Sequence, residues 1–394
     1  MKTPVDVDQI HVLADLHLGA PMTNDIPQVM SLLEDALQAM RNAKTSALVF
    51  AGDLFDKAHP RTRWYAEGAR LVRRALSLGF RVVVLLEGNH DVDERSRTFA
   101  GDTADSALDV LRAAFEEDPR VLIPSGPDVA SLTLDGAPVG LLPHPYRRLE
   151  DFSDAAPSVI LAHFAPEGGA AGADYTIERG VNVEAAFGED GSPRVVVAGD
   201  LHTPQELQLG AVTCVVPGSP YPVRMADVRG LRRYITIQPG RVDSVWLPSQ
   251  WSVVDVLARL DALEPDAWGA VLERCVKQAC AGLRAQADLC NVALRICLNL
   301  TLAISARHLS DADAFVESVR ERYDALRVTV TPQDLLDAVA PVDEEAAERY
   351  DLSAEDARAP LTPEERLNGY LTAKIHEPEV LEAATGFVEE LLSS

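Results

Sequence analysis

The stretch Ala47-Leu-Val-Phe-Ala-Gly-Asp-Leu-Phe-Asp56 is a short apolar run that ends in a glycine and two acids. Five apolar residues in succession suit a strand that is buried on both faces, as in a parallel sheet. Gly52 allows a sharp turn directly after this strand, so that Asp53 would lie just beyond its carboxyl end. In open parallel sheets, ligands bind beyond the carboxyl ends of the strands. The stretch therefore predicts an α/β fold with a polar site at one edge of a sheet.

Four further clusters of acid, amide and histidine residues have the same position relative to apolar runs. They are Asp15-Leu-His17, Gly88-Asn89-His90-Asp91, Ala162-His163 and Gly199-Asp200-Leu-His202. Counted along the chain, Asp15-Leu-His17 is the first of the five clusters and Gly52–Asp56 is the second. The runs before them, which we predict to be strands, are residues 10–13, 81–86, 159–162 and 195–198. Any single cluster also fits a chance match, a turn, a helix cap or a buried histidine. The recurrence of metal-ligand residue types at strand ends predicts a binuclear metal site.

The first 250 residues alternate apolar runs with amphipathic stretches, which is typical of a layered α/β core. We predict helices at about residues 27–43, 62–78 and 104–115. The segments 131–142 and 211–246 contain strands with little helix between them. A second sheet packed on the first is the simplest interpretation of this pattern.

A domain boundary is predicted near Pro248-Ser249, which gives domains at residues 1–248, 249–331 and 332–394. The middle domain is expected to be a small α+β unit. Its predicted elements are a helix at 252–263, a strand at 289–305, a helix at 310–323 and a strand at 326–331. The acidic last domain is expected to form a helical tail, with apolar stripes in 363–374 and 378–392 suited to docking a partner.

The chain has 394 residues and a net charge of −25, which is unusual for a nucleic-acid binder acting alone. Residues 201–250 nevertheless carry five arginines against three acids, whereas residues 331–394 carry four basic residues against sixteen acids. Local basic strips could therefore still contact a polyanion. With no run of 18 apolar residues and no signal-peptide pattern, we expect a cytoplasmic, DNA-associated protein without a membrane anchor. The apolar neighbours of Cys275, Cys280, Cys290 and Cys297 favour packing of these four cysteines in the core over a zinc site.

Two segments contain the candidate contacts to nucleic acid. Residues 57–65 follow the second cluster and offer cations and aromatic rings for phosphates and bases, although a solvated loop entering a helix is the alternative. The second segment is an arginine strip in residues 224–233. The candidate residues in these two segments are Arg61, Arg63, Trp64, Arg224, Arg232 and Arg233.

The five clusters resemble the motif pattern of the calcineurin-like metallophosphoesterase superfamily, namely Asp-x-His, Gly-Asp, Gly-Asn-His-Asp/Glu, a lone His and Gly-His-x-His. Within it, the chain resembles the SbcD-type nuclease subunits of DNA double-strand-break repair. Leu18-Gly19 after the first motif, Asp56 after the second and Pro217-Gly-Ser-Pro-Tyr221 after the last carry this closer resemblance. The resemblance is strong to about residue 222 and weaker beyond. In one departure, Asp200 stands where the family has a histidine.

The resemblance implies a sandwich of two sheets flanked by helices, with an α+β capping domain and a helical tail that binds an ATPase. It implies a first metal ion held by Asp15, His17, Asp53 and His202. It implies a second ion held by Asp53, Asn89, His163 and Asp200. His90 would face the scissile phosphate without binding a metal, with Asp91 orienting it. Because the second ligand set is rich in oxygen, Mn²⁺ is expected, or Mg²⁺, rather than Zn²⁺.

The resemblance further implies a metal-dependent DNA exonuclease or endonuclease that serves repair, recombination or replication. It would form a homodimer and act with an SbcC-type coiled-coil ATPase. Two alternatives stay open. One is a phosphatase or small-substrate phosphodiesterase of the same superfamily, for which a capping domain and docking tail would be superfluous. The other is a weakly catalytic DNA-end adaptor for the ATPase, which only the departure at Asp200 supports.

Overall fold

The computed structural model describes residues 3–21, 26–40, 46–93, 105–152, 157–171, 176–224, 230–260, 263–305, 308–323 and 327–332. The chain divides into two compact units. The first comprises residues 1–254 with 278–297, and the second comprises residues 255–277 with 298–394. Residues 333–394, and with them both amphipathic stretches predicted for the tail, lie outside the described residues.

The first unit contains two large sheets. The six-stranded sheet has the order β15-β14-β2-β3-β4-β7. Its strands are β2 (Gln9–Leu13), β3 (Ser46–Ala51), β4 (Val82–Leu86), β7 (Val121–Leu122), β14 (Arg233–Gln238) and β15 (Arg241–Trp246). Strands β2, β3, β4 and β7 are parallel, whereas β14 pairs antiparallel with both β2 and β15.

The seven-stranded sheet has the order β1-β8-β9-β10-β11-β13-β12. Its strands are β1 (Val5–Val7), β8 (Leu132–Leu134), β9 (Ala137–Leu142), β10 (Val159–His163), β11 (Arg194–Gly199), β12 (Gln205–Leu209) and β13 (Val212–Val216). Strands β9, β10, β11 and β13 run parallel, and β12 closes one edge antiparallel to β13. All strands predicted for the first 250 residues are present.

Strand β3 illustrates why the apolar runs are continuous. Ala47, Val49 and Ala51 join the core between the two sheets, whereas Leu48 and Phe50 join a second core on the opposite face. Because successive side chains of a strand point to opposite faces, every residue of a strand covered on both faces is buried.

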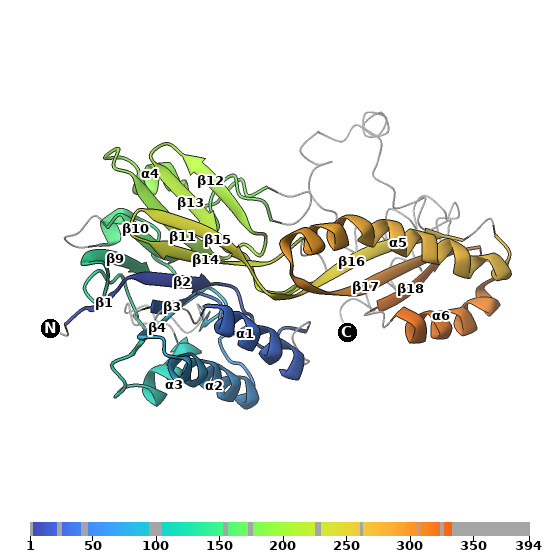
Figure 1. Cartoon of the computed structure of the whole chain (residues 1–394), viewed down its shortest axis with the longest axis horizontal. Helices are drawn as coiled ribbons and strands as arrows, with labels where there is room; N and C mark the ends of the chain where they lie inside the picture. Colours follow the sequence, from blue (N-terminus) through green and yellow to red (C-terminus); the bar gives the residue numbers. More distant parts are fainter. Residues whose placement is uncertain are drawn as a thin grey trace, which may run out of the picture. The chain divides into compact units, whose positions relative to one another are not determined.

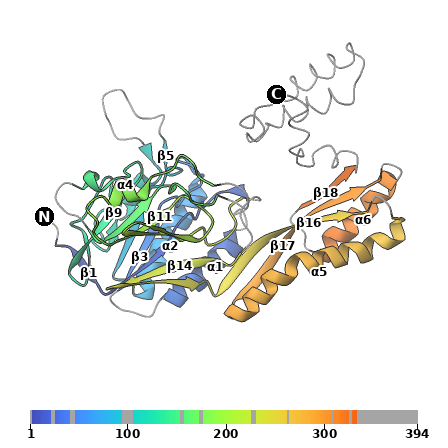
Figure 2. The same cartoon turned by 90° about the horizontal axis from the view of Figure 1, so that it is seen from above.

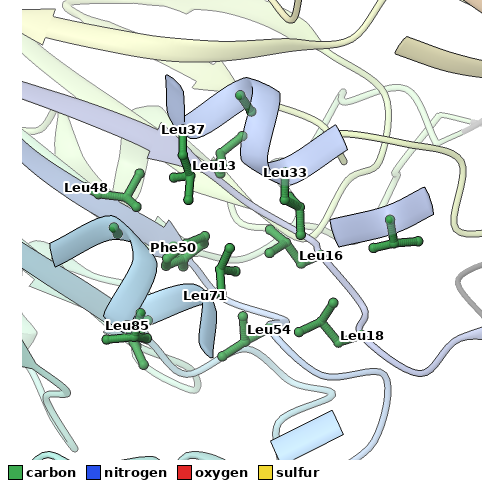
Figure 3. Close-up of a cluster of buried hydrophobic side chains, with 14 of the residues drawn as sticks. Leu13, Leu16, Leu18, Leu33, Leu37, Leu48, Phe50, Leu54, Leu71 and Leu85 are labelled. Atoms are coloured by element: carbon green, nitrogen blue, oxygen red, sulfur yellow. The ribbon is translucent and has the colours of Figure 1, made fainter. Parts of the chain in front are cut away.

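Helices cover the outer faces of both sheets. Helices α1 (Ile26–Met40), α2 (Thr62–Leu78) and α3 (Leu108–Ala114) lie on the six-stranded sheet, and α4 (Val183–Phe187) lies on the seven-stranded sheet (Figure 1). Figure 3 shows Leu33 and Leu37 of α1 facing Leu13, Leu48 and Phe50 of the strands. The expected two-sheet sandwich flanked by helices is therefore confirmed.

The last part of the described chain contains a further sheet of three strands and two helices. They are β16 (Ser249–Arg259), β17 (Ala293–Ile304) and β18 (Arg327–Pro332), in that sheet order, with α5 (Pro265–Cys290) and α6 (Leu309–Tyr323). Figure 2 shows both helices on the same side of this sheet. The predicted strands at 289–305 and 326–331 and the predicted helix at 310–323 are confirmed.

The helix predicted at 252–263 is wrong, because β16 occupies most of this segment. Val254, Val256 and Ala258 are buried, whereas the residues between them are exposed, which is the period of two of a strand covered on one face. Helix α5 was not predicted, although it begins with a proline at its first position, where proline is favoured.

The smaller elements complete the described chain. A two-stranded sheet of β5 (Val92–Asp93) and β6 (Asp105–Ser106) follows the third cluster, and a short 3₁₀ helix, η3, spans Leu149–Asp151. All five cysteines are free; of the four expected in the core, Cys280 and Cys297 are buried, whereas Cys275 and Cys290 are partly exposed. In the part of the chain that the structure describes, no helix is both long and apolar enough to cross a membrane.

Candidate metal centre

The five clusters meet because their strands end at the same edge. Leu13 of β2 is in register with Phe50 of β3, and Ala51 of β3 with Leu86 of β4, so the first three clusters follow neighbouring parallel strands. In the other sheet, His163 is in register with Gly199, the first residue of the fifth cluster. The two sheets therefore each contribute part of one site.

Four of the clustered residues adopt an unusual backbone conformation. Asp15, His17, Asp53 and Asp200 have φ angles of 56°, 43°, 51° and 99°, in the left-handed region. A side chain in this region costs about 1–2 kcal/mol, which the surrounding structure must offset. Such strain concentrates at functional sites, and only two other non-glycine residues in the described ranges share it.

Two glycines are required by the close approach of the clusters. A Cβ atom on Gly52 would lie 2.0 Å from Nδ1 of His163, and a Cβ on Gly88 would lie 2.1 Å from Oδ1 of Asp53. Both distances are impossible for a real Cβ atom without displacing its neighbour. The glycines of the Gly-Asp and Gly-Asn-His-Asp motifs therefore let the histidine and the carboxylate enter the site.

Asp53 lies at the centre of the site. Its Oδ2 is 3.4 Å from Nε2 of His17, and its Oδ1 is 3.4 Å from Nε2 of His163. Nε2 of His17 is 3.1 Å from Nε2 of His202, and Nε2 of His163 is 3.0 Å from Oδ1 of Asn89. The two oxygens of Asp53 thus face two separate groups of potential ligands.

The side chains present fit divalent metal ions. Potential ligand atoms lie within 4.8 Å of one another in the groups Asp15–His17–His202, Asp15–Asp53–His163 and His17–Asp53–His90. Oδ2 of Asp15 is buried and has no hydrogen-bond partner within the described ranges. A buried carboxylate oxygen without a partner is costly unless a cation compensates it. Imidazole, carboxylate and amide donors together suit divalent transition metals.

The buried carboxylates of the site also favour the binding of cations. Burial raises the pKa of Asp15 to about 7; the charge of His163 opposes this rise and that of Asp53 adds to it. Burial alone would also raise the pKa of Asp53, but the charge and hydrogen bond of His163 and the charge of His17 hold it well below its ordinary value. Burial would lower the pKa of His163, but Asp53 outweighs this effect and raises the pKa well above its ordinary value. Metal ions would replace the proton that these carboxylates hold on His163.

Three histidines are oriented by groups that the sequence did not reveal. Nδ1 of His163 lies 2.9 Å from the carbonyl oxygen of Ala51, to which it donates, so that Nε2 faces the site. Nδ1 of His90 lies 2.9 Å from the carbonyl oxygen of Asp56. The carboxylate of the same Asp56 is 3.6 Å from Nδ1 of His17. A carboxylate behind a metal-binding histidine fixes the ring and raises its basicity.

Asp91 does not have the expected contact with His90. It is fully buried, and its Oδ1 accepts a hydrogen bond of 2.9 Å from the backbone N–H of Phe55. Its Oδ2 accepts from the backbone N–H groups of Gly88, at 3.0 Å, and Leu54, at 3.3 Å. Asp91 therefore joins the second and third clusters to each other, and Asp56 supplies the orienting contact for His90 instead.

Asp200 lies at the rim of the site. Its backbone N–H donates to Oδ1 of Asp15 at 2.9 Å. Its side chain is 30% exposed, and Oδ1 is 3.9 Å from Nε2 of His163. Among the described residues, no group of converging ligand atoms includes it. Its expected role as a ligand of the second ion stays a prediction.

The residues predicted to contact nucleic acid separate into two sets. Arg61, Arg63 and Arg224 are exposed. Trp64 is only 2% exposed and belongs to the core beneath α2, so the prediction that it contacts DNA is wrong.

Arg232 and Arg233 are also buried, at 1% and 7% exposure. Arg232 Nη1 donates to the carbonyl oxygen of His202 at 2.9 Å, and Arg233 pairs with Glu206 at 3.0 Å. Their predicted contact with DNA is wrong, because both guanidinium groups bind carbonyl or carboxylate oxygens inside the protein.

Parts of the chain are similar to known proteins. Residues 9–204 match the family of calcineurin-like phosphoesterases. A phosphodiesterase from an archaeon is 13% identical, with 61% of this chain and 99% of that chain covered and a TM-score of 0.32. Zinc-bound Vps29 from Entamoeba histolytica is 14% identical, with 60% and 97% covered and a TM-score of 0.29. Phosphopantetheinyl hydrolase from Mycobacterium tuberculosis is 16% identical, with 56% and 92% covered and a TM-score of 0.32. None of the curated proteins matches the chain.

Proposed function

This chain carries a calcineurin-like phosphoesterase domain at residues 9–204, a metal-dependent hydrolase of phosphoester bonds, and we propose that its substrate is the backbone of DNA. The observation that carries the proposal of a binuclear centre is the position of Asp53. Each of its two oxygens lies 3.4 Å from a different histidine, His17 or His163, so that each oxygen could bind a separate ion.

The two ions would be held by residues from both sheets. Asp15, His17 and His202 would bind the first ion, and Asn89, His163 and Asp200 the second, with Asp53 shared. When bound, two divalent ions activate water and neutralise the charge that grows on a phosphodiester. We assign Mn²⁺ to the site because carboxylate and amide oxygens dominate the second ligand set.

His90 is proposed to act on the substrate rather than on the metal. The carbonyl oxygen of Asp56 accepts from Nδ1 at 2.9 Å, which fixes the ring and leaves Nε2 for the substrate. The His90 and His17 rings are edge to face with centroids 4.7 Å apart, so His90 lies beside the first ligand group. With a second proton on Nε2, the His90 imidazolium would donate that proton to the leaving oxygen, a contribution of about 10²–10⁴-fold.

A cationic strip beside the centre supports a polyanionic substrate. Lys57, Arg61 and Arg63 are exposed and, with His59, line a pocket of about 310 Å³ that also includes Asp56. Asp56 contacts His17, so the pocket adjoins the first ligand group. Lysine and arginine contacts to phosphates fix the register of a nucleic acid. The strip stands out in a chain whose net charge is −25.

A nuclease subunit of this charge would act with partners. We propose a homodimer associated with an SbcC-type coiled-coil ATPase, which would add basic surface to this acidic chain. The acidic segment after residue 332 is the proposed docking element, because its apolar stripes have helical spacing and its charge would suit a basic partner. Copurification of the ATPase with the full-length chain, lost when residues 363–392 are deleted, is the expected result.

The alternative of a weakly catalytic adaptor is favoured by one observation. Asp200 replaces the family histidine and keeps a partly exposed side chain at 3.9 Å from His163. A poorly held second ion would leave DNA binding intact and slow hydrolysis.

One set of assays separates the possible functions. Linear duplex DNA and bis(p-nitrophenyl) phosphate are incubated with Mn²⁺ and the wild-type chain, His90→Gln, or His308→Gln as a matched control in the second unit. We expect wild type and His308→Gln to cleave DNA and His90→Gln to be at least about 10²-fold slower. Turnover of the small diester without DNA cleavage would contradict the DNA proposal and favour a small-substrate enzyme. DNA binding without turnover of either substrate would favour the adaptor.

A further inference from the structure

We propose that Tyr221 is a positioning residue that holds the first metal-binding loop in place. Its side chain is fully buried, and its hydroxyl donates a hydrogen bond of 2.6 Å to the carbonyl oxygen of Leu16. Leu16 lies between the two ligands Asp15 and His17, so this bond fixes the backbone that connects them. The inference concerns the metal centre and does not depend on the substrate being DNA.

Residues 217–221, the segment that ends in Tyr221, also hold the fifth cluster in place. The backbone N–H of Ser219 donates to the carbonyl oxygen of His202 at 3.2 Å. Gly218 has a φ angle of 74°, and a Cβ atom there would lie 2.8 Å from the same carbonyl oxygen. Residues 217–221 therefore clamp two loops, one after β2 of the six-stranded sheet and one after β11 of the seven-stranded sheet.

Arg232 completes the clamp from inside the protein. Its Nη1 donates to the carbonyl oxygen of His202 at 2.9 Å, so this oxygen accepts bonds from both Ser219 and Arg232. A guanidinium group that is only 1% exposed is costly to bury, so its place beneath a ligand indicates that the loop position matters.

The clamp adds to a direct bond between the two loops, in which the backbone N–H of Asp200 donates to Oδ1 of Asp15 at 2.9 Å. Nε2 of His17 and Nε2 of His202 are 3.1 Å apart, close enough for one ring to donate to the other, whereas binding one ion requires that both nitrogens offer it a lone pair. Asp15 and His17 also have strained, left-handed backbones. The bond from Tyr221 lies between these strained residues, where it can preserve the geometry before the ion binds.

Tyr221→Phe removes this bond with little other change. The ring stacks on Trp251 with centroids 6.1 Å apart and an interplanar angle of 21°, and phenylalanine preserves that contact. Outer partners of metal ligands typically contribute 10–100-fold to affinity. We expect the ion bound by Asp15, His17 and His202 to bind about tenfold more weakly in Tyr221→Phe.

The test is a Mn²⁺ titration of the full-length chain, with free Mn²⁺ measured by electron paramagnetic resonance. Tyr234→Phe is the matched control, because Tyr234 is a buried tyrosine that packs on His11 instead. Thermal unfolding in EDTA is measured beside it, since a merely structural role would lower the melting temperature and leave the Mn²⁺ affinity unchanged.

An approximately tenfold loss in Tyr221→Phe, with Tyr234→Phe within about twofold of wild type, supports the inference. Wild-type affinity in Tyr221→Phe overturns it, whatever the melting temperature. If Tyr221→Phe does not fold, Gly218→Ala is titrated instead; weaker binding supports the clamp and unchanged binding overturns it. A wild-type chain that binds no Mn²⁺ overturns the metal centre itself, which is a different result from failure of the clamp alone.

Discussion

Acid should destabilise this protein through His11, a histidine of β2 that plays no part in the proposed chemistry. His11 is 3% exposed, its Nδ1 lies 3.1 Å from Oγ1 of Thr236, and its ring meets those of Phe80 and Tyr234 edge to face. Burial lowers the pKa of His11 to about 4, from an ordinary value of 6.5. The folded protein therefore holds this imidazole neutral.

The direction and size of the effect follow from proton linkage. Because the pKa is lower in the folded than in the unfolded chain, the unfolded chain takes up a proton first as the pH falls. The stability from neutral His11 is fully present above about pH 6.5 and is lost between about pH 6.5 and 4. At about 1.4 kcal/mol per pKa unit, the complete loss is roughly 3 kcal/mol, of which about 2 kcal/mol is lost between about pH 7.5 and 5.

The assay is urea unfolding of wild type and His11→Gln at both pH values, in EDTA so that metal binding does not contribute. Glutamine can bond Thr236 but cannot take up a proton. The free energy of unfolding of wild type should fall by about 2 kcal/mol more than that of the variant. Equal pH dependence of wild type and His11→Gln would refute the reasoning.

Three further predictions concern the centre and its surroundings. Gly52→Ala should weaken Mn²⁺ binding at least about tenfold in calorimetry, because its Cβ would lie 2.0 Å from His163, and unchanged affinity would contradict the described packing. Asp200→His should shift the second site from Mn²⁺ toward Zn²⁺ in competition titrations, whereas no shift would mean that residue 200 is not a ligand. Arg61→Gln should reduce the salt dependence of DNA binding by about one phosphate contact while turnover of a small diester stays constant; an unaltered salt slope would argue against contact.

The sandwich and the meeting of the clusters could be predicted from the sequence because both depend on local patterns. All six residues of β3 are buried, so its continuous apolar run correctly indicates a strand that is covered on both faces. The acid, amide and histidine residues that follow such strands then indicate at which edge of the sheets the site lies. Strand β16 was mistaken for a helix because Val253, Val254 and Val256 allow both periods, and pairing with β17 decides between them.

Contacts between distant residues could not be read in the same way. Arg232 is expected at the surface because arginine is seldom buried, yet the carbonyl oxygen of His202 accepts a hydrogen bond from its side chain inside the protein. The burial of Trp64 did leave a signal. Gly68, Leu71 and Val72 follow it at helical spacing on the buried face of α2, which indicates a core position rather than a base-stacking one.

The central claim is that Asp53 bridges two metal ions, and counting bound Mn²⁺ tests it most directly. The number of ions per chain is measured by titration under the same conditions for wild type and Asp53→Ala. Two ions should bind to the wild-type chain, and both should be weakened in the variant, because each loses one oxygen ligand. A wild-type chain that binds one ion, or a variant that keeps one of two ions at unchanged affinity, would contradict the bridge.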